Sequence, residues 1–173
     1  MIRPVLVSRV VPPRRSSVAF LLAQVGGLAA ERFGERIAAI GLTRAQAGLL
    51  RAIASSDQPM SQQALATHLD LAPSRLVVLV DELADAGILE RRPVEDDRRA
   101  YAVHFTTAGK ELFAKLAGIG REHEQAFCAP LTETERSLLD ELLRKLADAH
   151  GLRTGVHPGY KNLEPPAKRK GER

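Results

Sequence analysis

Residues 73–78 have the types and spacing of side chains that could contact the base edges of double-stranded DNA. On a helix that opens at Pro73, the positions opposite the apolar stripe are Ser74, Arg75, Val77 and Val78. A guanidinium can bond guanine O6 and N7 or a phosphate, a serine hydroxyl can bond a phosphate or a base edge, and valine methyl groups can touch thymine methyl groups. Arg75 is the only strong donor of this segment. The segment therefore predicts a partly apolar reading surface.

A second group of candidates lies at Ser61 and Gln62. Backbone N–H groups and short polar side chains at the start of a helix suit a phosphate. We therefore expect Ser61 and Gln62 to contact the DNA backbone.

The third group is charged and consists of Asp97, Arg98 and Arg99. Asp97 and Arg99 are two residues apart, so in an extended strand their side chains project to the same side and the carboxylate could brace the guanidinium. Arg98 would lie opposite. A braced arginine at a hairpin tip suits a narrow minor groove. The alternative is a solvated tip whose ion pair contributes little to stability.

Candidates for catalysis, metal binding and redox sensing are sparse. The sequence has no Gly-x-Ser-x-Gly motif, no phosphate-cradling glycine-rich loop and no pair of histidines four residues apart. The closest ligand-like pair is Glu124 with Cys128. We interpret Cys128 as a packed small hydrophobe rather than a peroxide sensor, because no basic residue stands within four positions of it. We expect no enzyme activity, no cofactor and no metal site.

Hydrophobic periodicity and capping residues predict the helices that position these groups. Four are expected in the first half of the chain, over residues 18–40, 43–55, 61–69 and 73–87. Thr43 and Gln46 form a capping pattern at the start of the second helix, and Pro73 occupies the first position of the fourth. Two short helices across a three-residue turn indicate a helix-turn-helix.

The second half of the chain changes period. Residues 88–92 and 100–105 are expected to form two strands around a charged turn at residues 93–98, with Tyr101, Val103 and Phe105 facing inward. A hairpin in this place is a wing. Two more helices follow, the first opened by a cap at residue 106 or 107 and the second by a cap at residue 132. The predicted fold is mainly α with a small β-hairpin wing, that is, a winged helix-turn-helix plus a helical dimerisation region.

The first, fifth and sixth helices carry apolar faces that no predicted sheet covers. A second copy of the chain related by a two-fold axis is the simplest partner for them. We therefore expect a homodimer.

The distribution of charge separates the ends from the middle of the chain. The net charge is +4, but residues 1–15 hold four arginines and no acid, and residues 151–173 hold six Lys or Arg against two Glu. The region between them has a net charge of −4. Basicity of the whole chain is therefore poor support for nucleic-acid binding, and the two ends are expected to be disordered basic arms.

One targeting alternative lies near the start, where Arg14 and Arg15 precede an apolar stretch. Its periodicity continues through charged residues into the rest of the first helix, and the stretch is too short to span a bilayer. A lone cysteine is compatible with a reducing compartment. We expect a cytoplasmic protein without a membrane segment.

The residues at the predicted wing carry a family resemblance. The segment DRRAYAVHFTTAG at residues 97–109 resembles the D-x-R-x-x-x-L-x-L-T-x-x-G signature of MarR-type transcriptional regulators. The matching positions are Asp97, Arg99, Thr106 and Gly109, with Val103 and Phe105 in place of the two leucines. Further matching segments are GLT at 41–43, SQQALA at 61–66 and PSRLVVLVDELADAGILERR at 73–92. The resemblance covers roughly residues 17–148.

The resemblance implies a homodimer that binds a pseudo-palindromic operator, with recognition helices in successive major grooves and Arg99 in the minor groove beside Asp97. It also implies release of DNA by a small ligand, often phenolic, or by oxidation of a cysteine. Many members carry Thr-Arg where this chain has Val77 and Val78, and Arg where it has Glu82. We therefore expect an operator preference unlike the family's commoner ones.

These observations lead to one function and one alternative. The main expectation is a ligand-responsive DNA-binding regulator, a repressor, with double-stranded DNA, a second copy and a small aromatic effector as partners. The alternative is a winged-helix protein-interaction module without sequence-specific DNA readout. The expected organisation is a basic extension at 1–16, a MarR-like domain at 17–150 with its DNA-binding lobe at 43–106 and dimerisation helices at 17–40 and 107–150, and a basic tail at 151–173.

Overall fold

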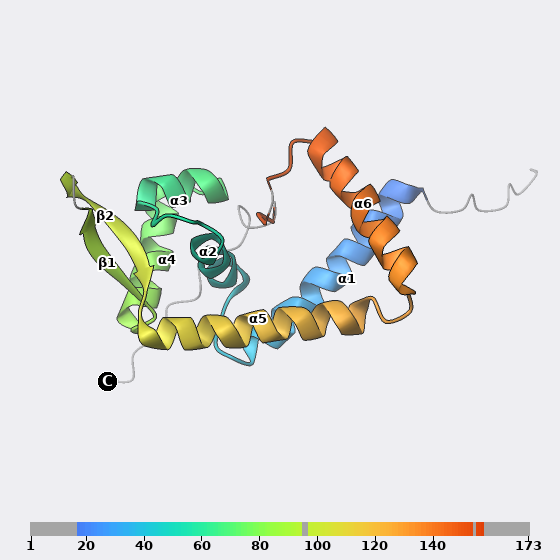
Figure 1. Ribbon diagram of the computed structural model, residues 1–173, viewed down its shortest axis with the longest axis horizontal. Helices are drawn as coiled ribbons and strands as arrows, with labels where there is room; N and C mark the ends of the chain where they lie inside the picture. The colour runs from blue at the N-terminus through green and yellow to red at the C-terminus, as the bar shows by residue number, and fades with distance from the viewer. Residues whose placement is uncertain (1–16, 95–96, 154, 158–173) are drawn as a thin grey trace, which may run out of the picture.

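The computed structural model describes residues 17–94, 97–153 and 155–157, and within them six helices and one antiparallel hairpin (Figure 1). Helices α1 to α4 span Val18–Ala38, Arg44–Ala54, Gln62–Leu69 and Pro73–Asp85. Strands β1 and β2 span Leu89–Val94 and Asp97–Phe105, and helices α5 and α6 span Thr107–Phe127 and Glu133–Ala149. This order confirms the predicted fold class, a mainly α winged helix-turn-helix with additional long helices.

The predicted helix starts are confirmed by their caps. Gln46 donates its backbone N–H to Thr43 Oγ1 (3.2 Å), and its side-chain oxygen accepts from the Thr43 N–H (3.0 Å). Thr132 and Glu135 form the same reciprocal arrangement at the start of α6. Ser61 caps α3. Such caps satisfy N–H groups that have no partner inside the helix. Local sequence alone therefore determines where these helices begin.

The hydrophobic core lies in the lobe formed by α2, α3, α4 and the hairpin. The apolar stripe of α4 faces it, and the largest fully buried side chains of the described residues are Ile37, Leu49, Leu50, Leu65, Leu69, Leu76, Val80 and Val103. The chain before α3 is joined to the hairpin, because Val103 donates its N–H to the Met60 carbonyl (3.2 Å) and Ser61 pairs with Ala102. The helix-turn-helix and the wing thus share one core.

The hairpin is longer than predicted. Its pairing continues from Leu89 opposite Phe105 to Pro93 opposite Tyr101, and becomes irregular between Pro93 and Val94. The predicted turn at residues 93–98 is therefore wrong at both of its ends. A proline is compatible with strand pairing here because one edge of each strand in a two-stranded ribbon makes no ladder bonds.

The predicted alternation of β2 holds only in part. Val103 is buried, but Tyr101 is 49% exposed, so its predicted inward orientation is wrong. Ala102, which was expected on the opposite face, is buried because it pairs with the chain at Ser61. The segment before α3 therefore covers part of the hairpin that a free wing would leave open to solvent.

The long helices leave large apolar surfaces exposed. Helix α1 packs against α5, with the rings of Phe33 and His123 5.5 Å apart, while α6 extends from the far end of α5 (Figure 1). The exposed large apolar side chains of α1 are Val18, Phe20, Leu21, Leu22, Val25 and Leu28, and those of α6 are Leu138, Leu139, Leu142, Leu143 and Leu146. In the described part of the chain, no helix is both long and apolar enough to cross a membrane.

The region after α6 differs from its prediction. Residues 151–153 and 155–157, expected to begin a disordered tail, lie against the lobe, where Val156 packs on the core and Arg153 contacts α3. The prediction of disorder from Gly151 onward is therefore wrong for these residues. Residues 1–16 and 158–173, the predicted basic arms, lie outside the described residues.

Candidate nucleic-acid interface

Helix α4 presents the predicted reading surface to solvent. Ser74, Val77 and Val78 are exposed, with exposed fractions of 39% for Val77 and 47% for Val78. Pro73 is exposed at the first helical position, and Arg75 is half-buried and already has a contact within the protein. The neighbouring apolar positions of α4 are buried in the core. Val77 and Val78 therefore face solvent on a helix whose other valine and leucine side chains are buried.

Ser61 and Gln62, the predicted DNA contacts at the start of α3, both form hydrogen bonds within the protein. Ser61 accepts a hydrogen bond from the Ala64 N–H through its hydroxyl oxygen (3.2 Å), so the hydroxyl is used as a helix cap. The side-chain oxygen of Gln62, in the amide orientation that satisfies both of its polar ends, accepts from Arg91 Nε (2.6 Å) and Nη2 (3.0 Å). Gln62 is therefore a structural link between α3 and the hairpin.

Arg91 joins three elements of the lobe. From its position in β1 it donates to the Asp81 carboxylate on α4, and it also contacts Gln62 at the start of α3. Arg91 and Asp81 are only partly buried, with exposed side-chain fractions of 32% and 50%. Sequence reasoning missed this group, because no local periodicity relates Asp81 on a helix to Arg91 on a strand. The arrangement fixes the direction in which the wing leaves the helix-turn-helix.

Glu82 also has a partner on another helix. Gln46 donates from Nε2 to Glu82 Oε2 (3.0 Å), so the capping residue of α2 also holds the carboxylate of α4. Many of the MarR-type regulators that this sequence resembles carry an arginine at the position of Glu82. Its half-buried carboxylate therefore ties α4 to α2.

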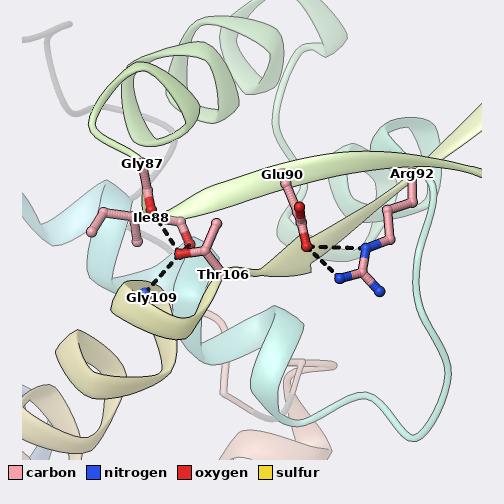
Figure 2. Close-up of polar contacts among 6 residues, drawn as sticks. All are labelled: Gly87, Ile88, Glu90, Arg92, Thr106 and Gly109. Atoms are coloured by element: carbon pink, nitrogen blue, oxygen red, sulfur yellow. Dashed lines mark hydrogen bonds and ion pairs between the residues drawn. The ribbon is translucent and has the colours of Figure 1, made fainter.

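The wing is described for its base but not for the side chains at its tip. In β1, Arg92 contacts Glu90 through Nε (3.0 Å) and Nη2 (2.5 Å), as Figure 2 shows. The backbones of Asp97, Arg98 and Arg99 form the start of β2. Their side chains lie outside the described residues, as do residues 95–96. The predicted brace between Asp97 and Arg99 is therefore kept as a proposal.

Thr106 and Gly109 fasten the base of the wing to α5. The Thr106 hydroxyl donates to the Gly87 carbonyl (2.6 Å), and its oxygen accepts from the Gly109 N–H (3.0 Å), as Figure 2 shows. The Thr106 N–H donates to the Ile88 carbonyl (3.1 Å). The threonine and glycine at the end of the wing signature thus join three segments, the end of α4, the start of β1 and the start of α5.

Comparison with known proteins agrees with this geometry. The family model described as the MarR family matches residues 40–100, from the end of α1 into the wing. A putative transcriptional regulatory protein for the hcr operon of Thauera aromatica is 34% identical over 106 residues, which are 61% of this chain and 63% of that protein. The HTH-type transcriptional regulator PecS of Dickeya dadantii is 33% identical over 73 residues, 42% of this chain and 44% of that one. Over these residues the chain is similar to the MarR family and to transcriptional regulators.

A structural relative supports the same assignment. A crystal structure of a mutant MarR from E. coli, complexed with operator DNA, has a TM-score of 0.64 and 25% identity, and it covers 75% of this chain and 92% of that one. The match to each of the two sequence relatives spans less than two thirds of that relative's length. The matched residues 40–100 include the helix-turn-helix and the first part of the wing.

A cavity of about 420 Å³ lies between the lobe and the long helices. Its wall includes the rings of Phe33 and Phe113, the guanidinium-bearing Arg51 and Arg121, and Glu124. These residues come from α1, α2 and α5. The cavity combines apolar faces with cations at one site, a composition typical of small-molecule pockets.

His123 lies in an aromatic row beside the cavity. Its ring is 5.5 Å from the ring of Phe33 and 5.6 Å from that of Phe127. Burial and then the positive charge of Arg36 lower the pKa of His123, with a smaller contribution from Arg32, while Glu124 opposes them in part. The environment between α1 and α5 therefore favours the neutral imidazole.

Cys128 is held as a neutral thiol at the end of α5. Its Sγ donates to Glu124 Oε1 (3.4 Å), and burial, followed by this hydrogen bond and the carboxylate charge, raises the pKa of the thiol. A reactive sensor cysteine needs the opposite shift. Among the described residues, no three His, Cys, Asp or Glu side chains gather in a way that could hold a metal ion.

Proposed function

We propose that this protein is a transcriptional regulator that binds a pseudo-palindromic DNA operator as a homodimer and releases it when a small effector binds. The observation that carries the proposal is the exposed face of α4 in a winged helix-turn-helix whose wing, α3 and α4 are held together through Arg91. A protruding, rigidly mounted helix of this kind fits the major groove. A regulator that binds chromosomal DNA would also have to be in the cytoplasm, which is the predicted location.

The reading chemistry follows from the exposed side chains of α4. The methyl groups of Val77 and Val78 would contact thymine methyl groups, and Ser74 would bond a base edge or a phosphate. Arg75 would reach guanine or phosphate after exchanging its present contact. Because both valines would contact thymine methyl groups, we expect A·T base pairs at the centre of each half-site.

The other predicted residues would position the protein on the duplex. Arg99, braced by Asp97, would enter the minor groove, with Arg98 on the phosphates. The start of α3 would offer the backbone around Ser61 and Gln62 to a phosphate, since the side chain of Gln62 is engaged with Arg91. Pro73 would pack against the sugar-phosphate backbone at the entry of α4.

The dimer in this proposal forms through the apolar faces of α1, α5 and α6. The leucine stripe of α6 and the first half of α1 expose large apolar side chains to solvent. The exposed fractions of the five α6 leucines range from 40% to 54%. A two-fold partner would cover both faces at once. It would also place two α4 helices on one side of the DNA.

The effector in this proposal is a small aromatic acid. The rings of Phe33 and Phe113 would hold its apolar part, and Arg51 or Arg121 would bind its carboxylate or phenolate. Arg51 belongs to α2 in the lobe, while Arg121 belongs to α5. An occupant of this cavity would therefore change how the lobe sits on the long helices.

The alternative is a protein-interaction module without specific DNA readout. Val77 and Val78 favour it, since an exposed apolar face suits a protein partner. Glu82 weighs less in its favour than the sequence implies, because its carboxylate already accepts from Gln46. The regulator therefore remains the better-supported function.

A gel shift tests the proposal with the DNA upstream of the protein's own gene as probe. We expect a specific, competitor-resistant complex of the dimer at moderate salt. Arg99→Ala should weaken it by about 1–3 kcal/mol, whereas Arg144→Ala, at an exposed ion pair on α6, serves as the matched control. An intact dimer that forms no specific complex with this DNA would contradict the regulator and favour the interaction module.

A further inference from the structure

The chain turns back to the lobe after α6. Gly151, with φ +63°, ends the helix, and Leu152 donates its N–H to the Ala147 carbonyl (2.9 Å). In Figure 1 the following segment leaves the end of α6 and runs back toward α2 and α3. We call residues 151–153 and 155–157 the C-terminal strap.

Arg153 of the strap caps the end of α3. Its Nη1 donates to the backbone carbonyl of His68 (3.1 Å) and also contacts the carbonyl of Thr67. The last carbonyls of a helix have no intrahelical donors, and they form the negative end of the helix dipole. A guanidinium here satisfies both requirements, because it supplies N–H donors and a positive charge.

The end of α3 differs from the ends of its neighbours. The left-handed residue that follows the helix is Gly41 after α1, Gly87 after α4 and Gly151 after α6, but it is Asp70 (φ +56°) after α3. Among the described residues, Asp70 is the only non-glycine with a positive φ. A side chain makes this conformation less favourable, although aspartate tolerates it better than most. The turn of the helix-turn-helix thus depends more on outside support than the other helix ends do.

The strap has a second anchor three residues further on. Val156 packs against the core of the lobe, and Gly155, with φ +77°, turns the chain just before it. Together with Leu69 and Asp70, Val156 and Arg153 border a cavity of about 190 Å³. Because the strap begins where α6 ends, it joins a dimerisation helix directly to the turn between α3 and α4.

We propose that the strap fixes the turn between α3 and α4, and that Arg153 is a positioning residue for DNA binding rather than a DNA contact. The part that concerns DNA rests on the proposed function. Loss of Arg153 loosens the end of α3, so α4 and the start of α3 no longer hold one fixed geometry toward the duplex. The part that concerns the turn applies to the free protein as well.

Hydrogen exchange in the free protein tests the role in the turn. In Arg153→Ala we expect faster exchange at the amides that close the end of α3, Asp70 and Leu71, by about two- to fivefold. Arg144→Ala is the matched control, because it removes an arginine whose ion pair with Asp140 is exposed and lies within α6. Unchanged exchange at Asp70 and Leu71 in Arg153→Ala would overturn the proposal.

DNA binding tests the positioning role. With the upstream DNA as probe, Arg153→Ala should bind about two- to fivefold more weakly and retain the wild-type salt dependence. A direct phosphate contact would instead reduce the slope of log K against log salt by about 0.9. A reduced slope, or an unchanged affinity, would overturn the positioning role. If the wild-type protein binds no DNA, the proposed function fails, and the exchange experiment still decides whether the strap holds the turn.

Discussion

Gly109 lies so close to Ile88 that a Cβ at position 109 would stand 2.0 Å from the Ile88 carbonyl oxygen. That oxygen also accepts the Thr106 N–H, so it is fixed in place by the start of α5. A backbone oxygen held in this way cannot move aside as the end of a flexible side chain could. The glycine of the wing signature is therefore required by the packing of α5 on the residue that precedes β1.

Gly109→Ala should lower the free energy of unfolding by about 1–3 kcal/mol, because the added methyl group forces the start of α5 away from Ile88. Gly120→Ala is the control in the same helix, since a Cβ there meets nothing within 4 Å. That variant should be more stable than wild type by about 0.5–1 kcal/mol. Urea unfolding of both variants measures the difference, and equal stabilities would show that the contact at Gly109 is not tight.

Arg91→Ala should impair DNA binding more than it impairs stability. The ion pair with Asp81 is partly exposed, so its loss should change the free energy of unfolding by less than about 1 kcal/mol. Its loss also removes the side-chain contacts of the wing with Gln62 on α3 and Asp81 on α4 at once. Arg92→Ala removes a pair within one strand and is the matched control. Fluorescence anisotropy with the upstream DNA compares them, and similar losses of affinity would contradict a positioning role for Arg91.

Cys128 should react slowly with peroxide and alkylating reagents. Burial and Glu124 raise the pKa of its thiol, so the reactive thiolate is scarce near neutral pH. Glu124→Gln removes the carboxylate charge, and the thiol pKa should fall toward its ordinary value. Mass spectrometry should then detect faster alkylation in the variant than in wild type at the same pH. Peroxide-sensitive DNA binding that Cys128→Ser abolishes would contradict this interpretation.

His123 should make the protein less stable in mild acid. Its pKa in the folded state is lowered from the ordinary value of 6.5, so the unfolded chain binds the proton more readily than the folded one. The stabilising contribution of the neutral ring is present above about pH 6.5 and is lost progressively as the pH falls below that value. His123→Phe keeps an aromatic ring and should flatten this dependence. Thermal unfolding at several pH values measures it, and identical pH profiles would refute the assignment.

The helices and the core of this fold are predictable because their signals are local. The threonine caps at residues 43 and 132 act within three residues, and the buried stripe of α4 repeats every three or four positions. The exposed set opposite that stripe follows from the same periodicity. For this reason Ser74, Val77 and Val78 were predicted on the correct face.

The features that the sequence did not predict all join distant segments. Arg91 reaches Asp81 and Gln62 only because β1 runs past α3 and α4, and Arg153 reaches α3 across more than eighty positions of the chain. The length of the hairpin likewise depends on how well two strands pair, which neither strand encodes alone. The contacts of residues 151–153 and 155–157 with the lobe were missed for the same reason, because composition cannot reveal a docking contact.

Because α5 is attached to the wing at Thr106, a movement of the helix would be passed on to the wing. With 21 residues at about 1.5 Å each, α5 is a lever about 32 Å long whose near end is fixed to the wing. A tilt of about 5° at the end near His123 would move the wing by roughly 3 Å, close to the spacing of one base pair. In the proposed function, a molecule that pushes apart α1, α2 and α5 would therefore need only a tilt of this size to move the wing by about the spacing of one base pair.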